Sequence, residues 1–169
     1  MSQAISKEQV IVPAQIQYLP VLRKFISRIG SKYKFAKKEI NAFKISIDEA
    51  CTNIIKHGYS TDLSGSITMK VMVNEERLIV ELIDQGKSFD PNSVSNPNLK
   101  NYVETGKKGG LGIFIMRKFL DEINYEINNH HNILRLTKNR SNSSPPMIVP
   151  ITSAFQRLKQ KLFPAKTTK

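Results

Sequence analysis

The pattern of apolar and polar positions predicts two helices in the first part of the chain. Residues 18–29 place apolar side chains three or four positions apart, which gives a helix one stripe that can face a core. Residues 40–54 repeat this spacing. The second helix is expected to end at Gly58, because glycine readily takes the left-handed conformation that terminates helices.

A change of period then predicts strands. Residues 67–73 alternate apolar and polar side chains, and a turn leads into a second strand over 78–83. The next segment, 85–110, is rich in Asn, Pro, Ser, Gly and Lys. A segment of that length with no periodicity of its own, inside a compact domain, indicates a functional loop.

The remaining apolar segments predict a helix over 111–120 and two short strands near 123–127 and 133–137. The elements therefore follow the order helix, helix, strand, strand, long loop, helix, strand, strand. Because each element has to bury one face against another layer, this order predicts an α+β fold. We expect a two-layer sandwich with helices on one face of a mixed, mostly antiparallel sheet.

Composition narrows the class of protein. The length of 169 residues fits one compact domain, and eight Gly, eight Pro and one Cys exclude a collagen repeat and a disulfide scaffold. Cys51 has no second cysteine to pair with, and the first thirteen residues lack the apolar core of a signal peptide, so a cytoplasmic protein is expected. The net charge of +12 favours an anionic partner: nucleic acid, a membrane surface or an acidic protein.

A domain boundary is predicted near residue 140. The Ser- and Pro-rich stretch 141–146 reads as a linker, so residues 1–140 form the domain and 141–169 an extension. That extension contains five basic residues and no acid, and its apolar residues have helical spacing. An amphipathic helix packing back on the domain is the first interpretation, a basic helix docking on an acidic partner or anionic lipid the second, and direct nucleic-acid binding the third.

Polar residues that carry chemistry stand at two places in the first half of the chain. Glu49, Asn53 and His57 are four residues apart and would share one face of the second helix. Taken alone, that row reads as a solvated helix face. Asp84 ends an apolar strand and Gly86 follows closely, which would leave a carboxylate beside a backbone that a ligand ring can approach. Taken alone, this pattern is more often a simple turn.

A glycine cluster opens the third helix. Glycines at a helix start expose backbone N–H groups, and the helix dipole favours an anion there. Lys107 and Lys108 precede the cluster; they would either neutralise phosphate charge or lie solvated in the loop. The candidate phosphate-binding residues are Gly109, Gly110, Leu111 and Gly112.

Together these features describe a nucleotide site. Mg²⁺ binds few protein oxygens when phosphate supplies others, which suits the amide of Asn53. Glu49, one turn away, would take a proton from an attacking hydroxyl or orient that hydroxyl. Asp84 would accept a hydrogen bond from adenine.

Four segments carry a resemblance to a known family. Residues 46–59 read SIDEACTNIIKHGY, residues 84–91 read DQGKSFDP, residues 109–116 read GGLGIFIM, and residues 136–138 read LTK. In order and separation they resemble the N-box, the two glycine boxes and the closing strand of the anti-sigma-factor serine kinases, within the GHKL ATPase superfamily that includes histidine kinases and gyrase.

The resemblance implies an activity and partners. A member of this family binds ATP and Mg²⁺, phosphorylates a serine of a small anti-anti-sigma (STAS-type) protein, and sequesters a sigma factor, usually as a homodimer. By position, the resemblance makes Glu49 the catalytic base, Asn53 the Mg²⁺ ligand and Asp84 the adenine contact. It further implies that residues 87–108 form a lid over ATP, and that the pocket is shaped by Gly86, Gly110, Gly112 and Thr137.

One departure from the family pattern leaves an alternative open. The family usually has a glycine before its last strand, and His131 stands near that position here. A side chain there would crowd the pocket, which motivates the alternative of a nucleotide-gated sequestering module with little or no kinase activity. A detached catalytic domain of a histidine kinase is a third interpretation, but no dimerisation helix with a phosphorylatable histidine is visible.

Overall fold

The structure is a computed structural model that describes residues 6–59, 64–88, 111–128 and 130–141. Most of the expected lid and almost all of the expected extension lie outside these residues. In chain order the elements are β1 (Ser6–Pro13), η1 (Ile16–Tyr18), α1 (Leu19–Lys32), α2 (Lys37–Asn53), η2 (Ile54–Tyr59), β2 (Ser66–Val73), β3 (Arg77–Asp84), α4 (Gly112–Phe119), β4 (Glu122–Asn128) and β5 (His131–Asn139).

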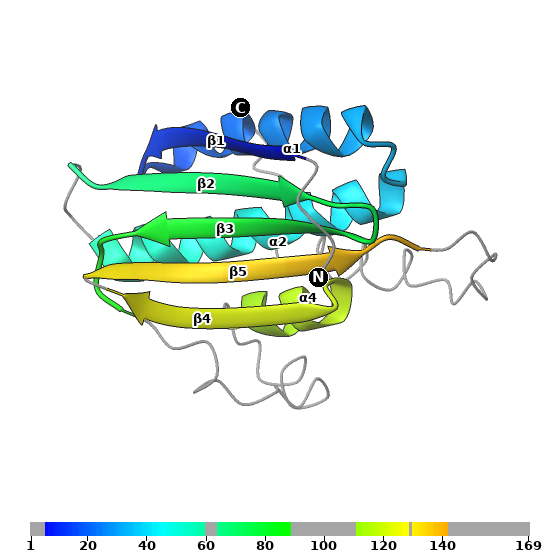
Figure 1. Ribbon diagram of the computed structural model, residues 1–169. Helices are drawn as coiled ribbons and strands as arrows, with labels where there is room; N and C mark the ends of the chain where they lie inside the picture. Colours follow the sequence, from blue (N-terminus) through cyan, green and yellow to red (C-terminus); the bar gives the residue numbers. More distant parts are fainter. Residues whose placement is uncertain (1–5, 60–63, 89–110, 129, 142–169) are drawn as a thin grey trace, which may run out of the picture.

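The molecule has one layer of strands and one layer of helices. The strands form a single sheet in the order β1-β2-β3-β5-β4, and every pairing among the described strands is antiparallel. The helices α1, α2 and α4 all lie on the same face of that sheet (Figure 1). The predicted two-layer α+β architecture is therefore confirmed. In the described part of the chain, no helix is both long and apolar enough to cross a membrane.

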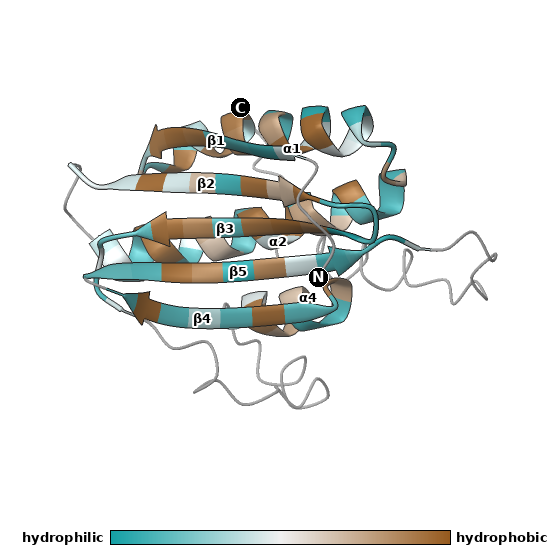
Figure 2. Ribbon diagram, viewed as in Figure 1, coloured by the Kyte–Doolittle hydropathy of each residue, from teal (hydrophilic) through white to brown (hydrophobic). Residues whose placement is uncertain are grey.

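The core lies between the two layers. Hydropathy alternates along the strands, as a sheet with one covered face requires (Figure 2). Burying one large aliphatic or aromatic side chain completely contributes roughly 1.5–3 kcal/mol, so these residues drive the two layers together. The largest fully buried apolar side chains are Leu22, Ile26, Ile29, Phe43, Ile47, Ile67, Met69, Leu78, Leu82, Met116 and Leu136.

Strand β1 was not expected from the sequence, where the first predicted element began at residue 18. It pairs with β2 along its whole length, at the edge of the sheet. Its covered face carries an acid: Glu8 forms ion pairs with Arg28 at 2.7 Å and with Lys32 at 3.2 Å, both on α1. A charged residue at a covered position weakens the apolar alternation by which the strand would have been recognised.

The second helix ends differently from the prediction. The α-helix stops at Asn53 and continues as the π-helix η2 to Tyr59, and Gly58 does not take the left-handed conformation. Instead, glycine allows two backbones to meet. A side-chain carbon on Gly86 would lie 2.8–2.9 Å from backbone atoms of Gly58, and the Lys87 N–H donates to the Gly58 carbonyl at 2.9 Å. The end of η2 therefore rests directly on the turn that follows β3.

The hydroxyl of Tyr59 strengthens the same junction. It donates to the carbonyl of Ser66 at 3.1 Å and accepts from the backbone N–H of Gln85 at 2.9 Å. One side chain at the end of η2 thus joins the start of β2 to the end of β3.

At the opposite end of α2, Glu39 holds the last described residues of the chain. Its buried carboxylate accepts the backbone N–H of Ala36 at 2.7 Å, and the N–H and hydroxyl of Ser141 at 2.6 Å each. The guanidinium of Arg140 lies 4.1 Å from the centre of the Phe35 ring and donates to the Tyr33 carbonyl at the end of α1. The strand layer and the helix layer are thereby tied together at residue 141.

We expect Glu39→Ala to lower the free energy of unfolding by about 1–3 kcal/mol at pH 7, because the donors of three partly buried hydrogen bonds lose a charged acceptor. Burial raises the pKa of the Glu39 carboxyl, but the hydrogen bonds from Ser141 and Ala36 outweigh it and hold that pKa below its ordinary value of 4.5. The contribution of Glu39 is therefore complete above pH 4.5 and disappears as the pH falls through the lowered value.

Urea unfolding at several pH values measures this effect, with Glu122→Ala as the control because Glu122 is exposed at the start of β4. The variant and the wild type should converge in stability at acid pH. Equal stability at pH 7 would contradict the role of Glu39.

We expect Gly86→Ala to destabilise the protein by about 1–3 kcal/mol, because the new carbon meets rigid backbone and the end of η2 has to move away from the strand. Gly58→Ala is the matched control. A carbon on Gly58 would lie 3.6 Å from its nearest neighbours, which is ordinary contact. Thermal unfolding measures both variants, and equal losses at the two glycines would contradict the close approach described here.

Candidate functional site

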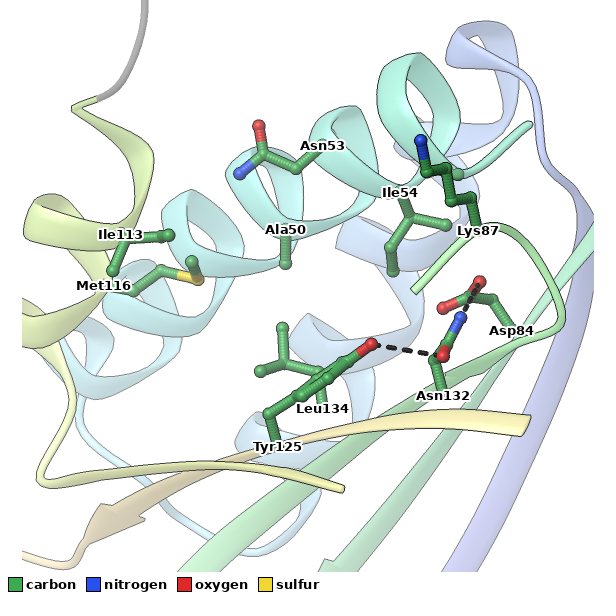
Figure 3. Close-up of a pocket in the computed structure, with 11 residues that line it drawn as sticks. Ala50, Asn53, Ile54, Asp84, Lys87, Ile113, Met116, Tyr125, Asn132 and Leu134 are labelled. Atoms are coloured by element: carbon green, nitrogen blue, oxygen red, sulfur yellow. Dashed lines mark hydrogen bonds between the residues drawn. The ribbon is translucent and has the colours of Figure 1, made fainter. Parts of the chain in front are cut away.

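A cleft opens between the helix layer and the ends of β3, β4 and β5. It contains about 460 Å³ of space, which includes a part open to solvent. Its walls come from α2, η2, α4 and the sheet, as Figure 3 shows. The lining residues are Ala50, Asn53, Ile54, Gly58, Asp84, Lys87, Ile113, Met116, Tyr125, Asn132 and Leu134.

Asp84 is the buried acid of this cleft, at the last position of β3. Its side chain and backbone are only 5% exposed. Oδ1 accepts the Gly86 N–H at 2.8 Å and the Asn132 side-chain amide at 3.0 Å, whereas Oδ2 is turned toward the cleft and accepts no hydrogen bond from the described residues (Figure 3). Burial raises the pKa of Asp84, and the hydrogen bonds from Asn132 and Gly86 partly offset that rise.

Asn132 was not expected to belong to the site. It pairs with Asp84 across β3 and β5 and is 4% exposed. Its amide nitrogen also donates to the Gly86 carbonyl at 2.9 Å, and its Oδ1 accepts the hydroxyls of Ser88 at 2.8 Å and Tyr125 at 3.1 Å. One feature of the sequence could have identified it. Asn132 is a polar residue that alternates in phase with the apolar residues of the last strand, which places it on the same face of the sheet as those residues.

The structure does not bring Thr137 to the cleft. Side chains alternate between the two faces of a strand, and Thr137 is five positions after Asn132, an odd number, so it belongs to the opposite face of the sheet. It pairs with Ile79 and Glu122, toward the far end of β5. The same parity turns His131 away from the cleft, and its ring lies 3.0 Å from the side-chain amide of Gln85. His131 itself is therefore not among the described residues that line the cleft, whereas its neighbour Asn132 is.

Glu49 and Asn53 meet the start of α4. A carbon on Gly112 would lie 3.0 Å from Glu49 Oε2 and 3.4 Å from Asn53 Nδ2, so both polar side chains reach this glycine. The helix begins with Leu111 as its N-cap, and the Leu111 side chain forms no cap hydrogen bond with the N–H groups of the first turn. The helix face and the glycine-rich helix start predicted separately are adjacent in the fold.

Other predicted residues lie elsewhere. His57 is exposed and is not among the described residues that line the cleft. The π-helix explains this, since its wider turn rotates His57 out of line with Glu49 and Asn53. Gly86 closes the base of the cleft through its contact with Gly58. Lys107, Lys108, Gly109 and Gly110 lie outside the described residues.

Comparison with known proteins places these features in a family. The family described as histidine kinase-like ATPase domain matches residues 12–138. Serine-protein kinase RsbW of Bacillus subtilis is 34% identical over 127 residues, covering 72% of this chain and 78% of the relative. Serine-protein kinase RsbW of Bacillus licheniformis is 31% identical over 131 residues, covering 75% of this chain and 82% of the relative.

A solved structure supports the same fold. The crystal structure of the RsbU and RsbW domains of a Mycobacterium tuberculosis protein matches with a TM-score of 0.59 at 16% identity. The match covers 85% of this chain but only 35% of that longer chain. With the family match and the named relatives, the resemblance to serine-protein kinases is confirmed, and the chain belongs to the histidine kinase-like ATPase family.

Proposed function

We propose that this protein is an ATP-dependent protein-serine kinase and anti-sigma factor that works by partner switching. It phosphorylates a serine of an anti-anti-sigma (STAS-type) protein, sequesters a sigma factor in a competing complex, and does so in the cytoplasm as a homodimer. The observation that carries the proposal is the meeting of Glu49 and Asn53 with the start of α4, beside a cleft with a buried acceptor at Asp84. The relatives named serine-protein kinase match over most of their length, which supports the same activity.

The residues of the cleft fit ATP and Mg²⁺. A buried carboxylate with one oxygen turned toward the cleft suits an amino group, and apolar walls from Ile54, Met116 and Leu134 suit a flat aromatic ring. At the other end, Gly112 leaves space that a side chain would fill, next to the N–H groups that begin α4. The acceptor for a base and the donors for phosphates thus stand at opposite sides of one cleft.

Each polar residue has a defined task in this proposal. ATP supplies the phosphoryl group, and Mg²⁺ offsets its negative charge. Asn53 would hold the metal through its amide oxygen, the atom of that side chain that can ligate Mg²⁺. Glu49 takes the proton of the substrate serine hydroxyl or orients that hydroxyl. The N–H groups at the start of α4 bind phosphate oxygens.

The remaining predicted residues act from the edges of the site. Lys107, Lys108, Gly109 and Gly110 precede α4 in sequence and would approach the phosphates when residues 87–108 close over the cleft. Lys87 lines the cleft itself and adds a positive charge there. His57 was grouped with the nucleotide-binding residues, but the structure leaves its side chain exposed at the end of η2. Its contribution to nucleotide binding would therefore be indirect.

We expect Glu49→Gln to bind ATP with near wild-type affinity but to transfer phosphate about a hundredfold more slowly or worse, because the amide cannot accept the serine proton. Calorimetry measures ATP binding, and mass spectrometry of the anti-anti-sigma partner after incubation with ATP and Mg²⁺ measures transfer. Glu122→Gln is the control, as the same change at an exposed position.

Full transfer by Glu49→Gln would contradict the role of Glu49. ATP binding by the wild type without transfer to any partner would contradict the kinase proposal and favour the sequestering module. That alternative was motivated by a side chain near His131; His131 is not among the described residues that line the cleft, whereas its neighbour Asn132 is.

A further inference from the structure

We propose that Asn132 is a positioning residue that makes the cleft select a purine with a 6-amino group over one with a 6-oxo group, by holding Asp84 in one orientation. The inference rests on the nucleotide site proposed above. It goes further by naming a residue outside the motifs of the sequence analysis, and a chemical rule by which the base is chosen.

The orientation of the Asn132 amide is itself fixed. Its nitrogen faces two oxygens that only accept, Oδ1 of Asp84 at 3.0 Å and the carbonyl of Gly86 at 2.9 Å. Reversing the amide would put its oxygen against both of them with no hydrogen in between. The hydroxyls of Ser88 and Tyr125, on the other side of the amide, could rotate to suit either orientation. The two acceptors therefore determine which way the amide lies. With all four of its hydrogen bonds made in a buried position, Asn132 has little freedom to move.

A fixed Asn132 leaves Asp84 with one oxygen for a ligand. Oδ1 is engaged by Asn132 and by the Gly86 N–H, and Oδ2 is turned toward the cleft (Figure 3). An ionised carboxylate oxygen only accepts hydrogen bonds. The 6-amino group of adenine can donate to it, whereas the 6-oxo group of guanine would place oxygen against oxygen. Sites built around a buried polar group reject the wrong partner strongly, because that group is then left unpaired.

Asn132 also favours the ionised form of Asp84. Burial raises the pKa of Asp84, and the hydrogen bond from Asn132 is the largest of the effects that lower it. Without Asn132, that pKa rises further and a larger fraction of Asp84 carries a proton at a given pH. A protonated carboxyl can donate to a 6-oxo group, so discrimination between the bases should weaken, and it should weaken more as the pH falls.

Other ionisable groups surround Asp84, and they are common to the wild type and the variant. They are Cys51 from α2, Lys87 after β3, Tyr125 from β4 and His131 from β5. Among these four, histidine is the residue type that changes charge near neutral pH. Comparing the two proteins at each pH therefore separates the effect of Asn132 from that of His131.

The test is calorimetric titration of the full chain with Mg·ATP and with Mg·GTP, between about pH 5.5 and pH 8. The ratio of the two affinities is the quantity to follow, because both nucleotides carry the same triphosphate and its titration cancels. In Asn132→Leu, which keeps the volume and removes all four hydrogen bonds, we expect the ATP-to-GTP ratio to fall by about tenfold or more. The fall should be larger at the acid end of the range.

Asn139→Leu is the matched control, since it makes the same change at an exposed position at the end of the same strand. Its affinity ratio should equal that of the wild type. Thermal unfolding monitors the fold of each variant. If Asn132→Leu does not fold, Tyr125→Phe and Ser88→Ala each remove a single hydrogen bond to Asn132, and each should lower the ratio by a smaller factor.

Three outcomes would overturn the inference. The first is a wild-type ratio in Asn132→Leu at every pH, or in both single-bond variants if Asn132→Leu does not fold. The second is a wild type that binds ATP and GTP equally, which leaves the kinase proposal intact. The third is a wild type that binds neither nucleotide, which removes the proposed nucleotide site as well.

Discussion

The functional cleft depends on one close approach, that of the Gly58 and Gly86 backbones. The end of the helix layer rests there on the turn after β3, at a distance that leaves no room for a side chain on Gly86. Asp84 is two residues before Gly86, and Asn53 is five residues before Gly58, so this contact sets how far the buried acceptor lies from the polar face of α2. The Tyr59 hydroxyl, shared between Ser66 and Gln85, holds the same junction from its other side.

Ion pairs join other elements, both within the helix layer and between the layers. Arg23 of α1 binds Asp48 of α2 at 2.9 Å, and Glu8 binds Arg28 across the gap between β1 and α1. Each is partly exposed and contributes about 1 kcal/mol or less, so they align the elements more than they stabilise them. Each pair also neutralises an acidic side chain with a basic one. The chain as a whole has a net charge of +12, and this positive excess favours a polyanionic ligand such as ATP.

Periodicity in the sequence was sufficient to predict the helices, four of the five strands and the layered architecture, because each of those elements has one clearly apolar face. Periodicity did not predict an element whose covered face carries a charged side chain that pairs with a partner from another element. Strand β1 carries Glu8 on its covered side, and the lysine and arginine that neutralise it come from α1, more than fifteen residues away. The sequence did not predict the π-helix either. The end of this helix packs against the turn after β3, and the local sequence contains no information about that contact.

The candidate site shows the same division. Motif spacing was sufficient to select Asn53 and Asp84, which line the cleft, and Glu49 and the start of α4, which meet next to Asn53. The closing-strand resemblance instead selected Thr137, on the opposite face of the sheet. Asn132 is in phase with the apolar residues of its own strand, but its contact with Asp84 is set by the register of two strands. A pairing partner of that kind is a property of the sheet and is not contained in any one segment.

The attachment of Ser141 to Glu39 has a consequence for signalling within the molecule. Glu39 is near the start of α2 and Asn53 is its last residue, so the exit point of the chain and the cleft are separated by 14 residues of this helix, about 21 Å at 1.5 Å per residue. Whatever docks on the chain beyond residue 141 begins its path remote from the nucleotide. If the state of the cleft is to be sensed there, two routes are available: the rod of α2, reached through the hydrogen bonds of Glu39, and β5, which leads along the chain from Asn132 in the cleft towards Ser141.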